Sequence, residues 1–499
     1  MLFNSGKFLI FFPIAVTVYF ILPKKLKKIW LLACSYCFYM AWNPAYILLL
    51  IASTLVTYFS AMSIDKYRSR DDKKAGKNVL VLCSVINIGL LIYFKYTGFI
   101  AYLTDRFITG VLHYHPVLTG IIPDIVLPVG ISFYTFQALG YTIDVYRGNI
   151  DAEHSIIDYA LFVSFFPQLV AGPIERSGSL LPQIRDIGNK KILDYDRIMN
   201  GLILMVWGFF MKVVIADRLS IIVDAVFDDQ FSYGASLRIL AAVAFSLQIY
   251  CDFAGYSTIA IGAARIMGIT LMENFNTPYF SGNIREFWSR WHISLSTWFR
   301  DYLYFPMGGS RCSAIRNSFN LMVTFLVSGL WHGAAAKYVI WGGLNGGLQI
   351  LSRTLKPIRA RLFKESQTGG NPLLKFAGII FNFAVVTLTW VFFRANSLRL
   401  AVEYIVHTVT RPDYMQFFKE HTYRSIISDR DLIITAAAVF ILFIASLIRY
   451  KKGVTLDLWL ASKTYPIRAA VIMFLLFYII IFGQYGEDVY SKPFVYFQF

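Results

Sequence analysis

The sequence predicts an all-helical protein that crosses a membrane many times. Of its 499 residues, 57% are hydrophobic and only 15% are charged, whereas soluble domains usually carry about a quarter charged residues. The mean hydropathy is +0.55. The apolar residues are gathered into long runs, and a membrane-spanning helix needs about 20 of them. Composition and patterning therefore agree on an all-α, polytopic fold class.

The apolar windows follow one another along the whole chain. They lie near residues 8–23, 29–62, 78–95, 157–172, 199–215, 236–251, 318–352, 374–393, 431–449 and 467–483. Some windows are long enough for a helix pair, and others are short and interrupted by Pro and Gly. We therefore expect roughly 10–13 transmembrane or re-entrant helices. They are expected to form one multi-pass domain over residues 1–499.

The first window does not have the pattern of a cleaved signal peptide. Its basic cluster (Lys24, Lys25, Lys27 and Lys28) follows the apolar run, and no small-residue cleavage site is present. Basic clusters mark the cytoplasmic side of a span. The sequence therefore predicts an extracytoplasmic N-terminus, and we expect the chain in a bacterial cytoplasmic membrane.

The net charge of +17 comes from 47 basic and 30 acidic residues. These charges stand in short loops between apolar windows, which favours contact with anionic lipid headgroups over binding of nucleic acid. A docking surface for an anionic cytoplasmic donor is the second interpretation. The five cysteines include a "CSYC" pair, Cys34 and Cys37, inside an apolar run. A redox or metal pair needs a polar, accessible setting, so we expect small side chains buried in lipid and no disulfide framework.

Residues 274–311 differ in kind from the apolar windows. Trp288, Trp291 and Trp298 alternate with arginines there, and this pattern at helical spacing predicts a helix lying in the membrane interface or dipping through it. The same pattern would also suit an amphipathic surface helix with no further role. His292 lies within this segment.

Common catalytic motifs are missing, which leaves ionisable residues inside apolar sequence as the candidates. There is no G-x-S-x-G, P-loop, H-E-x-x-H or G-x-G-x-x-G pattern, so we expect neither a metal nor a cofactor. His332 stands in "SGLWHGAAAKYVIWG", and Asp252 stands in "IYCDFAGYS". An ionisable group at membrane depth is costly unless it faces a cavity or a partner. For Asp252, pairing with another charge is the competing explanation.

Small residues surround His332, among them Ser328 and Gly329, and Gly342 and Gly346 form a G-x-x-x-G pattern. Small residues allow close helix packing, and they also leave room for a substrate beside an imidazole. Burial favours the neutral imidazole, which is the form that accepts a proton.

Several ordered sequence blocks resemble the membrane-bound O-acyltransferase (MBOAT) family, and in particular its branch of bacterial alginate O-acetylation membrane subunits. The blocks are "FKYTGF", "LPVGISFYTFQALGYTIDVYRG", "FFPQLVAGPIER", "YCDFAGYSTIAIG", "EFWSRWHISLSTWFRDYLYFPMGG", "SGLWHGAA" and "TWVFFRANS". The similarity runs over nearly the whole chain. Blocks in this fixed order are more specific than any one of them.

The resemblance implies a bundle of membrane helices around a central funnel or tunnel. It matches His332 to the catalytic histidine of the family and His292 to a second histidine that lies toward the cytoplasmic mouth. His332 would act as a general base on an alcohol. Our candidates for substrate-binding side chains are Trp331, Asn345, Trp288, Trp291, Arg290 and Asp252.

The implied reaction moves an acyl group, with acetyl favoured, from a cytoplasmic thioester to an extracytoplasmic hydroxyl. The donor would be acetyl-CoA or an acyl carrier protein. The acceptor would be a polysaccharide or a relay partner, such as an SGNH-type acetyltransferase. One departure weakens alginate as the acceptor: this chain has Asn345, in "WGGLNGG", where alginate-type members often have a histidine.

Two alternatives stay open at this stage. D-alanyl transfer toward teichoic acid keeps the fold and changes the group that is moved. A transporter or polymer export channel without chemistry would also bury charges and glycines, but the paired broken segments of inverted repeats are not evident.

Overall fold

The computed structural model describes residues 1–112, 127–191, 193–362, 372–415, 422–485 and 494. Over these residues the regular elements are all helices, which confirms the predicted fold class. The chain forms two compact units that interleave in sequence. Unit 1 holds residues 1–197, 264–272 and 333–335, and unit 2 holds residues 198–263, 273–332 and 336–499.

Seven helices among the described residues are long and apolar enough to cross a membrane. They are Pro44–Ser69, Lys73–Val111, Tyr195–Asp228, Ala235–Ile266, Pro372–Arg394, Asp429–Lys452 and Tyr465–Phe482. A shorter apolar helix covers Gly6–Ile21. The chain is therefore a multi-pass membrane protein. The predicted windows 157–172 and 318–352 fall instead on shorter or more polar helices.

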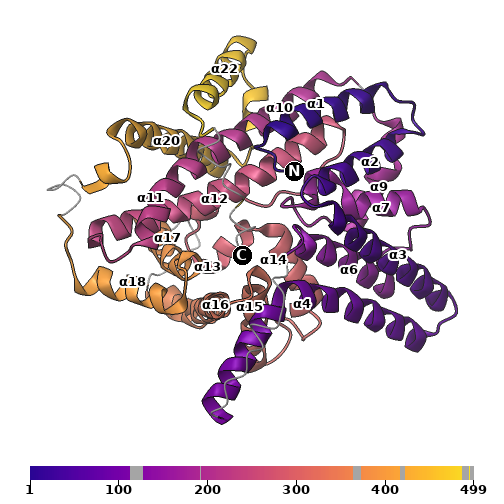
Figure 1. The fold of residues 1–499 in the computed structure, drawn as a ribbon, viewed down its shortest axis with the longest axis horizontal. Coiled ribbons are helices and arrows are strands. Elements are labelled where there is room, and N and C mark those ends of the chain that lie inside the picture. Colours follow the sequence, from indigo (N-terminus) through magenta and orange to yellow (C-terminus); the bar gives the residue numbers. More distant parts are fainter. Residues whose placement is uncertain (113–126, 192, 363–371, 416–421, 486–493, 495–499) are drawn as a thin grey trace. The chain divides into compact units, whose positions relative to one another are not determined.

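Unit 1 contains the helices of the first part of the chain. They are α1 (Gly6–Ile21), α2 (Lys27–Met40), α3 (Ile47–Ser69), α4 (Lys73–Leu112), α6 (Ile131–Arg147), α7 (Ile156–Ser164), α8 (Phe166–Leu169) and α9 (Ser177–Arg185). Helices α3, α4 and α6 lie side by side (Figure 1). The window 29–62 is a helix pair, because the chain breaks at Asn43 and Pro44 between α2 and α3. At this break the Asn43 side chain accepts a hydrogen bond from the Ala45 amide at 3.0 Å.

The predicted window 78–95 covers less than half the length of α4, which runs for 40 residues. At 1.5 Å per residue this helix is about 60 Å long, roughly twice the thickness of the hydrocarbon core. The lower hydropathy after Lys95 ended the predicted span there. The helix continues because no proline follows in this part of the chain, and Gly98 alone does not end it.

The first basic cluster makes contacts inside unit 1 as well as facing outward. Lys28 forms an ion pair with Asp158 at 2.8 Å, and Lys27 lies 4.9 Å from the centre of the Tyr19 ring. Lys24 donates to the side chain of Asn189 at 3.3 Å. Three of the four lysines therefore also hold parts of unit 1 together, and the cytoplasmic location of this cluster stays a prediction.

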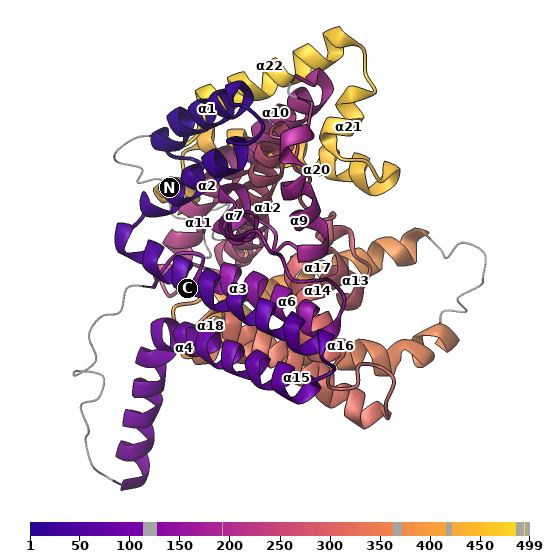
Figure 2. The ribbon, with the colours of Figure 1, turned by 90° about the vertical axis from the view of Figure 1, so that its right-hand side faces the viewer.

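Unit 2 holds the later helices. They are α10 (Tyr195–Phe209, whose first turn belongs to unit 1), α11 (Asp217–Asp228), α12 (Ala235–Ile266, whose last three residues belong to unit 1), α13 (Ile284–Arg290), α14 (Ile293–Phe299), α15 (Ala314–His332), α16 (Ala336–Leu362), α17 (Pro372–Arg394), α18 (Leu398–Thr410), α20 (Asp429–Lys452), α21 (Leu456–Ala461) and α22 (Tyr465–Phe482). Figure 2 shows α15 and α16 side by side. A π-helical turn, Phe210–Ala216, joins α10 to α11.

The segment 274–311 is not one helix. It forms α13, a break at Trp291 and His292, α14 and a π-helical turn over Arg300–Tyr304. Trp291 and His292 are each only 1% exposed. The surface-helix interpretation is therefore wrong for this part of the segment, because its central aromatic residues belong to the core of unit 2.

Candidate active site

His332 is the last residue of α15, and close packing against α16 fixes that helix end. A Cβ atom on Gly329 would lie 2.2 Å from the carbonyl oxygen of Tyr338, and one on Gly342 would lie 2.3 Å from that of Phe325. No side chain fits at these distances, so glycine is required at both positions. Close helix packing, one of the two uses proposed for the small residues, is confirmed for this pair.

Aromatic rings enclose the imidazole of His332. Its ring centre lies 5.0 Å from that of Trp331, 5.1 Å from that of Trp341 and 5.5 Å from that of Phe393, each at a steep interplanar angle. His332 is 4% exposed. These rings come from α15, α16 and α17, so three helices hold the imidazole in one orientation.

His292 reaches the same cluster through an unusual backbone. It stands between α13 and α14 with φ +43° and ψ +55°, in the left-handed region. That region is uncommon for residues other than glycine, although histidine is enriched there. Such a conformation typically costs about 1–3 kcal/mol and persists only where the surroundings enforce it.

Asn274 enforces the conformation that follows His292. Its side-chain oxygen accepts from the Ser294 hydroxyl at 2.6 Å and from the Ser294 amide at 3.3 Å. Its amide group donates to the Ser257 hydroxyl at 3.1 Å, and its backbone carbonyl accepts from the Ile293 amide at 2.9 Å. No sequence pattern points to Asn274, because an asparagine in a loop gives no motif signal.

The ring of Phe253 on α12 supports His292 directly, at 4.6 Å between ring centres and perpendicular. On another side, Trp331 lies 6.0 Å from the His292 ring. Trp331 therefore contacts both histidines. Burial lowers the pKa of His292, which lies outside the candidate spans, to about 3, so this imidazole is neutral at any physiological pH.

Other predicted site residues lie beside this cluster. Trp288 donates its indole N–H to the side-chain oxygen of Asn345 at 3.3 Å, and Asn345 donates to the backbone carbonyl of Trp341 at 2.9 Å. Trp341 is the same residue that contacts His332. Trp291 packs against Trp390, with ring centres 5.0 Å apart. The structure thus brings Trp288, Trp291, Trp331 and Asn345 together around the histidines.

Arg290 and Asp252 make contacts of another kind. Arg290 forms an ion pair with Glu286 at 2.7 Å and donates to the Thr277 hydroxyl at 3.2 Å. Asp252 forms an ion pair with Lys212 at 2.5 Å. Pairing accounts for both charges without a ligand, so a role in substrate binding stays a prediction for these two residues.

The C-terminal aromatic region contributes one described residue to this neighbourhood. Phe494 is 1% exposed, and its ring centre lies 5.3 Å from that of Phe253 and 5.1 Å from that of Tyr256. Phe253 is the residue whose other contact is His292. Phe494 therefore packs against Phe253, the ring that contacts His292.

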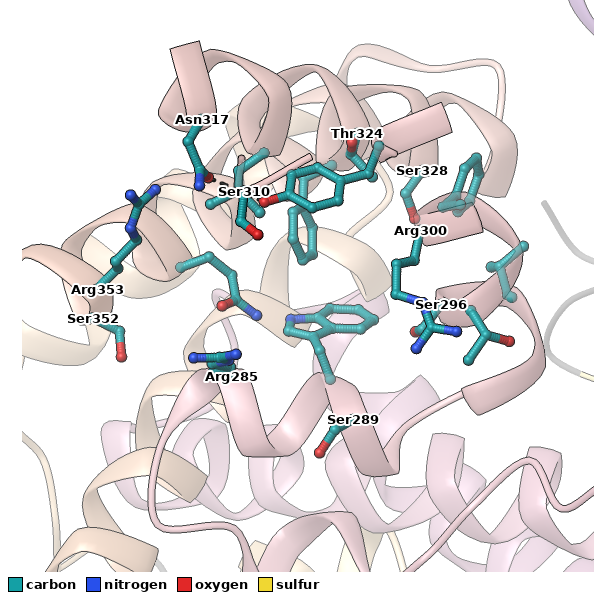
Figure 3. Close-up of a pocket in the computed structure, with 18 of the residues that line it drawn as sticks. Arg285, Ser289, Ser296, Arg300, Ser310, Asn317, Thr324, Ser328, Ser352 and Arg353 are labelled. Carbon is teal, nitrogen blue, oxygen red and sulfur yellow. Dashed lines mark hydrogen bonds between the residues drawn. The ribbon is translucent and has the colours of Figure 1, made fainter. Parts of the chain in front are cut away.

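A cavity of about 730 Å³ opens beside the histidine cluster, within unit 2 (Figure 3). Ser328, one helical turn before His332 on α15, lines it, and so does Trp288. The remaining lining residues are Asn283, Arg285, Ser289, Ile293, Leu295, Ser296, Thr297, Phe299, Arg300, Tyr304, Ser310, Asn317, Leu321, Thr324, Phe325, Gln349, Ser352 and Arg353. Over the part of the chain that the structure describes, no group of three or more His, Cys, Asp or Glu residues is arranged to hold a metal ion.

Comparison with known proteins decides the family. Residues 149–395 match the membrane-bound O-acyltransferase family. The chain is 40% identical over 402 residues to a protein of Pseudomonas aeruginosa named as an alginate O-acetylase, AlgI, covering 80% of this chain and 73% of that one. The chain belongs to the membrane-bound O-acyltransferase family. It is therefore an O-acyltransferase, and the alternative of a transporter without chemistry loses its support.

Two further relatives show the range of activities in this family. A peptidoglycan O-acetyltransferase of Helicobacter pylori is 36% identical to this chain, and the match covers 81% of this chain and 79% of the relative. A teichoic acid D-alanyltransferase of Bacillus subtilis is 31% identical to this chain, and the match covers 43% of this chain and 56% of the relative. The resemblance found from the sequence blocks is thus confirmed at the level of the family.

Proposed function

We propose that the acyltransferase moves an acetyl group from a cytoplasmic thioester to a hydroxyl of an extracytoplasmic polysaccharide or of a relay partner. The observation that carries this proposal is the cluster in which His332 and His292 both contact Trp331 beside an open cavity. A neutral imidazole that aromatic rings hold in one orientation can act as a general base on an acceptor hydroxyl.

In the proposed transfer, His332 is the only protein group that takes up a proton and releases it again. Its neutral nitrogen takes the proton of the acceptor hydroxyl while the hydroxyl oxygen attacks the thioester carbonyl carbon. The tetrahedral intermediate collapses with cleavage of the carbon–sulfur bond, and the imidazolium returns the proton to the departing thiolate. The products are an oxygen ester and a free thiol.

His292 has a different role in this proposal. Its low pKa makes it a poor base, but a neutral imidazole still carries one N–H donor. We assign that donor to the carbonyl oxygen of the thioester, where negative charge develops during attack. Removing one such donor typically costs about 10²–10³ in rate. The left-handed backbone fixed by Asn274 would aim the ring at that oxygen.

The choice of acetyl and of a polysaccharide rests on the relatives. Those with the broadest coverage are named for O-acetylation of alginate or of peptidoglycan. Asn345, which accepts a hydrogen bond from Trp288, is the departure from the alginate-type pattern described above, and it weakens alginate as the acceptor. The cytoplasmic location of the donor, the extracytoplasmic N-terminus and an SGNH-type relay partner belong to the same proposal.

D-alanyl transfer toward teichoic acid is the second candidate, because a relative with that name matches part of the chain. The match to that relative covers about half as much of this chain as the matches to the O-acetylation relatives do, and this favours acetyl as the group that is transferred.

The test compares the two esters in the host. Ester-linked acetate and D-alanine on surface polymers would be measured in cells that carry the wild type, His332→Ala or the control His154→Ala. His154 is an exposed histidine of unit 1. Loss of acetate alone in the His332 variant supports the proposal. Loss of D-alanine alone supports D-alanyl transfer, the second candidate. No change in either ester contradicts both candidate functions.

A further inference from the structure

Four basic side chains from separate parts of unit 1 gather where α2 begins. Lys24 lies in the turn before α2, and Lys27 is the first residue of that helix. Lys190 follows the 3-10 turn after α9, and Arg197 lies in the first turn of α10. A Cβ atom on Gly268 would lie 3.4 Å from the Lys190 side chain and 3.6 Å from the Arg197 guanidinium. We call these four basic residues the cation cluster.

Hydrogen bonds and a ring contact hold the elements of the cation cluster together. Lys24 donates to the side chain of Asn189 at 3.3 Å, which joins the start of α2 to the turn after α9. Lys27 lies 4.9 Å from the ring centre of Tyr19 on α1. The Tyr19 hydroxyl donates to the backbone carbonyl of Met267 at 2.9 Å, in the chain that follows α12. The four cations are therefore fixed in one place within unit 1.

The positive charges in this cluster exceed the negative charges that face them. Lys190 forms an ion pair with Asp186 at 3.5 Å, and the partner of Lys24 is a neutral amide. Lys27 is only 2% exposed, and it makes no ion pair among the residues that the structure describes. Burial lowers the pKa of Lys27, and the charges of Lys24 and Arg197 lower it further. Burying a charge is costly unless it is paired, so an anion at this place would relieve the repulsion.

Exposed apolar side chains surround the cation cluster along the chain. They are Ile21, Leu26 and Ile29 beside the two lysines of α2, and Leu193 and Tyr195 before Arg197. A soluble anion would gain nothing from such a rim. The acyl chains of a phospholipid would cover it, while the phosphate of the same molecule contacts the cations. Clusters of Lys and Arg at a membrane surface recognise anionic headgroups in this way.

We propose that the cation cluster is a binding site for the headgroup phosphate of an anionic phospholipid. Lys24, Lys190 and Arg197 contact the phosphate, and Lys27 adds its charge from beneath. The acyl chains lie along Ile21 and the exposed face at the start of α2. The inference is independent of the acyl-transfer reaction, because it involves unit 1 alone and neither of the two histidines.

Native mass spectrometry of the full-length protein in detergent, with phosphatidylglycerol titrated in, is the direct test. The Kd of the first bound lipid would be compared among the wild type, Lys24→Gln, Lys27→Met and the control Lys77→Gln, which changes an exposed lysine of α4. We expect the Kd to rise about five-fold for each cation removed from the cluster and to stay unchanged in the control. Equal Kd values in all four proteins would overturn the proposal.

Three further probes identify the source of the phosphate. They are phosphatidylcholine, inorganic phosphate and glycerophosphoglycerol, which is the same headgroup without acyl chains. We expect phosphatidylglycerol to raise the midpoint of thermal unfolding of the wild type more than any of these does at the same concentration. If inorganic phosphate or the chain-free headgroup stabilises the protein equally, the cluster takes a soluble anion and the proposal is wrong. Equal stabilisation by phosphatidylcholine would likewise contradict recognition of an anionic lipid.

The thermal midpoint of Lys27→Met separates lipid binding from a purely structural role of this lysine. Without lipid, the variant should be at least as stable as the wild type, because it removes a buried charge that Lys24 and Arg197 repel. Phosphatidylglycerol should then raise its midpoint less than it raises that of the wild type. A variant that is less stable than the wild type by the same margin with and without phosphatidylglycerol would show that Lys27 serves only the contact with Tyr19, and would contradict the proposal.

Discussion

At the scale of single residues, the proposed function gives different roles to two histidines with different backbones. His332 ends a regular helix and is held by the rings of Trp331, Trp341 and Phe393. His292 adopts a left-handed conformation that hydrogen bonds to Asn274 maintain just after it. The first position suits a base that must exchange a proton. The second suits a neutral donor that must not move.

The pKa of His292 predicts that its removal changes the rate and leaves the pH profile intact. Because burial keeps this pKa near 3, His292 does not titrate between about pH 5 and 8.5. The His292→Gln variant should lose about 10² in the rate of acetyl transfer, with the same shape of pH–rate profile as the wild type. The check is the initial rate across that range. An acidic limb present in the wild type and missing from the variant would show that His292 titrates during the reaction.

Asn274→Ala should lower both stability and activity. It removes hydrogen bonds to Ser294 and Ser257 in a buried site, and an unsatisfied buried group costs about 1–3 kcal/mol. We expect a lower midpoint of thermal unfolding and at least a ten-fold slower transfer, while Asn149→Ala, on the surface of unit 1, behaves like the wild type. Full activity in the Asn274 variant would mean that the His292 conformation needs no such support.

At the scale of elements, the contact between α15 and α16 sets the position of His332. Gly329 and Gly342 face each other there, with 3.2 Å between the Cα of one and an ideal Cβ built on the other. The two helices approach as closely as their backbones allow. This geometry explains why small residues precede His332, which the sequence alone left open between packing and substrate space.

Two glycine-to-alanine substitutions on α16 test this contact. Gly342→Ala places a methyl group 2.3 Å from the Phe325 carbonyl, so the helices must separate. We expect a loss of more than about 2 kcal/mol in stability, as for overpacking of a tight core, together with loss of transfer. Gly347→Ala meets nothing within 4 Å and should be neutral or stabilise the helix by about 0.5–1 kcal/mol. Thermal unfolding of both variants is the measurement, and equal midpoints would contradict the packing account.

At the scale of the whole molecule, the sequence predicted the class of fold better than its details. Apolar windows predicted most of the long helices, because hydropathy alone decides which segments enter a bilayer. The ends of α4 and the break at His292 escaped prediction, since they depend on backbone geometry rather than on composition. The family resemblance named His292 and His332 as site residues, but no local pattern indicates that Trp331 contacts both. Asn274 and the cavity arginines were found only from the fold.

Buried Glu175 in unit 1 gives the molecule a pH-dependent stability. Burial raises the pKa of its carboxyl to about 7, against hydrogen bonds from the Met272 and Arg176 amides and the charge of Arg176. The folded state therefore binds the proton more tightly than the unfolded state, whose pKa is about 4.5. The contribution of Glu175 to stability is therefore greatest below pH 4.5, falls between about pH 4.5 and 7, and is lower by about 3 kcal/mol above that range.

Glu175→Gln should remove that dependence. The variant should unfold at a higher temperature than the wild type at pH 8, and the difference should shrink toward pH 5. The measurement is the thermal midpoint of both proteins at the two pH values. Since other groups titrate in both proteins, only the difference between them is informative. A difference that is independent of pH would show that Glu175 is ionised in the folded state throughout.

The most direct measurement of the central claim is the rate of acetyl transfer from a labelled thioester by purified His332→Ala, beside the wild type and His154→Ala. Thermal unfolding would first establish that all three proteins are equally folded. If His332 is the general base, the variant should be slower by about 10²–10⁴, and His154→Ala should match the wild type. A folded His332→Ala protein that transfers acetyl at the wild-type rate would contradict the account.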